Sequence, residues 1–195
     1  MFDQVYSFFQ LGLFHVLNLA SWDHLLFVIA LAVPFSIDHW RNLFGWLGVY
    51  VAAHLVGFCL VYFSVLGLGD LSLAFLNPLF VVFLSLHNIF RERQSKRSKF
   101  FGLLFTVSLI LGGLHGFIST TALASNFTAD NAVFVETLSY HLGLFVGLIT
   151  TALVTLLIGF FGHVLLRFSR RDWIIFVSAL IIGLVLPFLV KSAPW

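Results

Sequence analysis

Several of the eight histidines in this chain stand inside long apolar runs, where ionisable side chains are rare. A neutral imidazole in an apolar medium needs a hydrogen-bond partner, and a charged group there costs several kcal/mol. Imidazole nitrogens bind divalent transition metals, and a nearby carboxylate can ligate the same ion or orient a ring. We therefore predict a site for nickel, cobalt, zinc or copper. Its candidate ligands are Asp23, His24, His54, His115, His141 and His15, with Glu136 as a further acid nearby.

Each of these histidines also has a simpler explanation when it is taken alone. Polar side chains join helices inside membranes by hydrogen bonds without any ligand. The group as a whole favours a functional site, because its members fall at one predicted depth. His39, His87 and His163 lie near the other ends of the apolar runs, where we expect capping or interfacial roles, and His87-Asn88 could line an exit.

The pair Asp23-His24 needs a break in the chain if both side chains are to serve one ion. Adjacent residues on a helix point about 100° apart. We predict a break at Leu19, Ala20 and Ser21, followed by a helix from Trp22 with Ser21 as its N-cap. The amide N–H groups at such a helix start would favour a carboxylate or an anionic ligand in the site.

The composition places these residues in a membrane protein. Of 195 residues, 61% are hydrophobic and only 9% are charged, which leaves too little polar surface for a soluble globule. We expect the lipid bilayer as a partner, no nucleic acid, and no cleavable signal peptide in residues 1–10. Cys59 is the only cysteine, which excludes cysteine-rich zinc and iron–sulfur sites.

Apolar runs with few charges predict an all-α, polytopic membrane helix bundle in one domain, residues 1–195. A helix crosses about 30 Å of hydrocarbon with roughly 20 residues. The first crossing contains Asp23 and His24, so we predict that it is broken or re-entrant near Ser21. The six predicted spans are residues 5–37 (broken), 42–66, 70–90, 100–123, 133–163 and 173–190.

The cationic residues orient these six spans. Nine of the ten lysines and arginines fall in three segments that share one side of the membrane, and only Lys191 falls on the other side. Cationic loops face the cytoplasm. Both termini are therefore predicted outside, which puts the candidate ligands in the outer half of the bilayer.

Short motifs around these ligands resemble the HupE/UreJ family of small bacterial membrane proteins. The likeness covers about residues 10–150, and the segment 167–173 resembles Bacteroidetes members of the family. The motifs are His15 followed by Trp22-Asp23-His24-Leu25-Leu26-Phe27, then Ala53-His54, Leu114-His115-Gly116-Phe117 and Leu142-Gly143. The resemblance implies a multi-pass protein of the bacterial inner membrane with six or seven helices, and some family members are regarded as nickel or cobalt permeases.

The chain departs from the family pattern at three places. Seven residues separate His15 from Asp23, where the family has five. A family Gly-x-Glu pattern is replaced by Gly143-Leu144-Phe145, and a family Glu-Asn is replaced by His87-Asn88. Apolar or imidazole groups thus stand where the family has carboxylates.

Three functions fit this sequence. The first is a divalent metal permease of the nickel or cobalt type. The second is a membrane-embedded metalloenzyme, such as a hydrolase of lipids, in which a three-ligand ion activates water and Asp23 or Glu136 acts as general base. The third is an accessory protein without metal. No motif specifies a reaction, so the sequence leaves open whether the protein is an enzyme.

Overall fold

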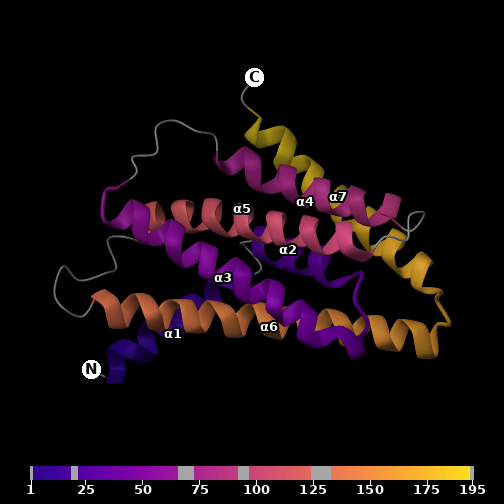
Figure 1. Cartoon of the computed structure of the whole chain (residues 1–195), viewed down its shortest axis with the longest axis horizontal. Coiled ribbons are helices and arrows are strands. Elements are labelled where there is room, and N and C mark those ends of the chain that lie inside the picture. The colour runs from indigo at the N-terminus through magenta and orange to yellow at the C-terminus, as the bar shows by residue number, and fades with distance from the viewer. Residues whose placement is uncertain (1, 19–21, 66–72, 92–96, 124–132, 194–195) are drawn as a thin grey trace.

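The protein is all-helical in a computed structural model, which describes residues 2–18, 22–65, 73–91, 97–123 and 133–193 (Figure 1). The described part contains seven α-helices and one short 3₁₀ turn, η1. In chain order they are α1 (Phe2–Leu17), α2 (Trp22–Ala32), η1 (Ile37–His39), α3 (Trp40–Tyr62), α4 (Leu73–Arg91), α5 (Arg97–Leu123), α6 (Val133–Leu165) and α7 (Arg170–Ser192).

Four helical segments of the described chain are long and apolar enough to cross a membrane. They are Ile37–Tyr62, Gly102–Thr120, Val133–Leu165 and Arg170–Ser192, and Phe75–Phe90 is a shorter apolar helix. The prediction of an all-α membrane-type bundle is thereby confirmed. The count of six spans stays a prediction.

The chain is divided into two helices where a break was expected. α1 ends at Leu17 and α2 begins at Trp22. Leu19, Ala20 and the predicted N-cap Ser21 lie outside the described residues, as does the side chain of Asp23.

Helices α3 and α5 run parallel and touch at their backbones. Glycines spaced four residues apart on α5 meet carbonyl oxygens spaced four residues apart on α3, which fixes the parallel direction. A Cβ atom at these glycines would collide with the facing oxygen. The contacts are Gly112 with Tyr50, Gly116 with His54, and Gly57 of α3 with Gly113 of α5.

A second parallel pair, α1 and α6, is built in the same way. Gly12 of α1 faces the carbonyl oxygen of Tyr140, and Gly143 of α6 faces that of Phe9. α6 has 33 residues, or about 50 Å at 1.5 Å per residue, so only its first half can lie along α1. Small residues at membrane helix contacts allow this approach.

The short helix α2 packs against α4, α6 and α7 (Figure 1). Pro34 follows α2 and has no N–H to give to the carbonyl oxygen of Ala30. The side chain of Asn88 on α4 replaces it, with Nδ2 at 2.7 Å from that oxygen. Arg170 then donates to the carbonyl oxygen of Pro34 at 2.7 Å. The end of α2 is thus tied to both α4 and α7.

We predict that Gly116→Ala destabilises the protein and that Gly113→Ala does not. The new methyl group at position 116 would meet the His54 carbonyl, whereas a Cβ at Gly113 meets nothing within 4 Å. Overpacking of this kind costs about 1–3 kcal/mol. Thermal unfolding in detergent should show a lower Tm for the first variant alone. Equal Tm values for the two variants would contradict the contact.

We also predict that Asn88→Ala lowers the free energy of unfolding by about 1–3 kcal/mol, because it leaves the buried Ala30 carbonyl unpaired. Asn42→Ala is the control, since Asn42 lies in α3 with its side chain exposed. Denaturant titration of both variants compares the two losses. If both variants unfold like the unmodified chain, Asn88 does not hold the end of α2.

Candidate functional site

Five histidines from five different helices form one row inside the bundle. His15 of α1 lies next to His24 of α2, with ring centroids 4.6 Å apart, and His24 lies 3.9 Å from His115 of α5. His115 is 6.4 Å from His54 of α3, which is 5.1 Å from His141 of α6. The structure therefore brings together all five histidines that the sequence singled out.

This row belongs to the core of the bundle. His54 is fully buried, and His24, His115 and His141 are each at most 3% exposed, while His15 is half-buried. Aromatic side chains pack around the row, namely Tyr50, Phe58 and Tyr140. Water is largely excluded, so each buried ring nitrogen depends on a partner inside the protein.

Hydrogen bonds fix the proton positions at one end of the row. Nδ1 of His141 lies 2.7 Å from the carbonyl oxygen of Thr137, and a carbonyl can only accept. Nδ1 of neutral His141 therefore carries the proton, and its Nε2 is an acceptor. Nδ1 of His54 lies 3.1 Å from that Nε2 and donates to it. Nε2 of His54 then accepts from the Ser119 hydroxyl at 3.1 Å.

The two candidate acids, Glu136 and Asp23, differ in how much the structure describes of their side chains. Glu136 is 1% exposed and accepts a hydrogen bond from Nε2 of Gln4. This bond ties the start of α1 to the start of α6, five residues before His141. Asp23 is part of α2, directly before His24, and its side chain lies outside the described part of the structure.

The imidazoles are arranged in successive pairs. Within the described ranges, no group of three or more histidine, cysteine, aspartate or glutamate side chains could hold one metal ion. Imidazole nitrogen suits zinc, copper, iron and nickel. In the row, one ring nitrogen of His54 lies 3.1 Å from one ring nitrogen of His141.

Two of the remaining three histidines, His39 and His163, form hydrogen bonds with residues close to them in the chain. His39 is exposed and shares a hydrogen bond with Ser36 at 2.8 Å. Nδ1 of His163 donates to the carbonyl oxygen of Phe168 at 2.9 Å. His87 is half-buried on α4. These two hydrogen bonds are local, since they join residues three and five positions apart in the chain.

Three residues of the site were not predicted. Ser119, Thr137 and Gln4 bond the members named above, but hydroxyl and amide side chains are common in membrane helices and give no signal alone. Ser119 could have been found, because it follows His115 by four residues and so shares its helix face.

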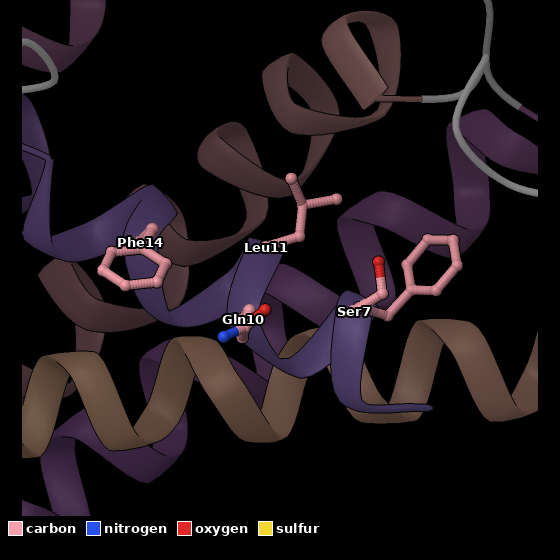
Figure 2. Close-up of a pocket in the computed structure, with 5 residues that line it drawn as sticks. Ser7, Gln10, Leu11 and Phe14 are labelled. Carbon is pink, nitrogen blue, oxygen red and sulfur yellow. The ribbon is translucent and has the colours of Figure 1, made fainter. Parts of the chain in front are cut away.

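The row does not coincide with the surface pocket on α1. That pocket has a volume of about 530 Å³, and its described lining is Ser7, Phe8, Gln10, Leu11 and Phe14. Figure 2 shows Ser7, Gln10, Leu11 and Phe14 on successive turns of α1. No histidine is among these described lining residues.

The comparisons with known proteins agree with the motifs. The family model described as "HupE / UreJ protein" matches residues 1–192. No curated protein and no solved structure matched the chain. The family match covers nearly the whole chain, including every histidine of the row. The chain therefore belongs to the HupE/UreJ family of membrane proteins.

Proposed function

We propose that this protein is a permease for a divalent transition-metal ion of the nickel or cobalt type. The observation that carries the proposal is the row of five imidazoles in the core, one from each of five helices. Membership of the HupE/UreJ family, which is linked to nickel and cobalt handling, supports it.

Paired imidazoles suit transport for a physical reason. An ion that leaves water must replace its lost water ligands, and imidazole nitrogens do so without adding charge. Conduction also requires sites that bind well enough to admit the ion and weakly enough to release it, often several in sequence. Two nitrogens hold an ion less firmly than a closed set of four. In the proposal, Asp23 adds a carboxylate beside His24 and partly offsets the charge of the ion.

The proposed topology gives the row a direction. We place residues 1–195 in the inner membrane as six crossings, with α1 and α2 together forming the first, and with both termini outside. The ion then enters where α1 and α6 begin, close to Glu136, and meets His141 and His54 first. His115, His24 and His15 follow, and α2 leads inward toward Asn88, whose Oδ1 shows no hydrogen bond within the described part.

We predict that His24→Ala and His115→Ala each reduce the uptake of nickel or cobalt by membrane vesicles at least ten-fold. Each substitution removes an imidazole from two neighbouring pairs of the row. A ten-fold change corresponds to about 1.4 kcal/mol. His39→Ala and His163→Ala, which lie outside the row, should leave uptake unchanged. Uptake is measured with expression verified for each variant.

Elemental analysis of the purified protein separates the alternatives. Normal uptake in both row variants would overturn the permease proposal. A tightly held ion without uptake would indicate a metalloenzyme, with Asp23 or Glu136 as general base. Stability in chelator, with neither metal nor uptake, would indicate an accessory protein.

A further inference from the structure

The hydrogen bonds of His54 occupy both nitrogens of its ring. Nδ1 donates to Nε2 of His141, and Nε2 accepts from Ser119. In this arrangement the lone pair of His141 Nε2 is taken up by the proton of His54. The pair is therefore closed to an ion.

The same two nitrogens have the spacing that an ion needs. With metal–nitrogen bonds of roughly 2.05 Å, nitrogens 3.1 Å apart subtend an angle of about 98° at a shared ion. This angle lies between the octahedral and the tetrahedral values. An ion can bind both nitrogens at this separation once each ring turns by about 40°, because the ion lies to one side of the line that joins the nitrogens.

Only one of the two rings, that of His54, can move its proton to the other nitrogen at little cost in free energy. His141 is held in its tautomer by the Thr137 carbonyl, which cannot donate. His54 instead faces a hydroxyl, which can either donate or accept. A proton on Nε2 of His54 would find Ser119 as an acceptor, and Nδ1 would then present its lone pair.

We infer that His54 and His141 form a two-nitrogen ion position that opens when His54 changes from its Nδ1–H to its Nε2–H tautomer, with Ser119 as the positioning residue. This inference rests on the proposed function. One proton leaves Nδ1 and one arrives at Nε2, carried by water that the entering ion sheds. The ring stays neutral, Ser119 turns from donor to acceptor, and no proton is released per ion.

Solid-state NMR of the full chain in bilayers, labelled with ¹⁵N-histidine, tests the tautomer directly. The probe is Zn²⁺ alone, because it is diamagnetic, and His54→Gln assigns the His54 signals by their absence. We expect protonated Nδ1 without Zn²⁺ and protonated Nε2 with it. Nδ1 still protonated at saturating Zn²⁺, or the release of one proton per bound ion, would overturn the inference.

Substitutions at Ser119 give a second readout. Ser119→Ala should weaken Zn²⁺ binding about ten-fold, because the Nε2–H tautomer that the bound ion requires loses its hydrogen-bond acceptor. Ser119→Thr keeps the hydroxyl and should bind within about two-fold of the unmodified chain. Ser139→Ala is the matched control, because its hydroxyl donates to the Val135 carbonyl of its own helix.

The two proposals can fail separately. If Ser119→Ala keeps full Zn²⁺ affinity while His24→Ala abolishes uptake, Ser119 does not position the ring, so the tautomer inference is wrong and the permease proposal stands. If the tautomer changes as expected but His24→Ala and His115→Ala transport normally, the ion position exists and transport is not its role.

Discussion

The close approach of helix backbones at glycines is the constraint on which the site depends. At Gly116, the carbonyl oxygen of His54 occupies the space that any side chain would fill. Ser119 and His115 flank this contact on α5, so the same approach sets their distances to His54. A hydrogen bond weakens steeply once its atoms separate beyond about 3.5 Å. Wider packing of α3 against α5 would therefore lose the polar contacts together with the apolar ones.

The position of His24 depends on a different constraint, the missing N–H of Pro34. Without Asn88, the carbonyl oxygen of Ala30 would stay unpaired in the core, so α2 is held where that amide can reach it. His24 lies six residues before Ala30 on the same helix, which is about 9 Å along the helix axis. A contact between α2 and α4 thus sets how deeply His24 lies next to His15 and His115.

Much of this arrangement could be predicted from the sequence, because membrane helices obey strong rules of length, apolarity and buried charge. Those rules predicted the helical class and a helix that begins at Trp22, and they singled out the five histidines that meet in the row. They could not give the order of the row, since it depends on which helices pack in parallel. They also could not show that Glu136 pairs with Gln4, because residues 132 positions apart carry no local pattern.

The neutral pair of His54 and His141 also bears on how a permease releases its ion. When an ion leaves buried ligands that have no other hydrogen-bond partners, their polar atoms stay unpaired. This raises the free energy of the empty site and disfavours ion release. His141 and His54 have partners when no ion is present, since Thr137 and Ser119 satisfy the outer nitrogens and the two rings satisfy each other. In the permease that we propose, the hydrogen bond between the rings can form again when the ion moves on toward His115, which lowers the free energy of the emptied site. In the proposed transport, the bond that closes the pair thereby favours onward movement of the ion.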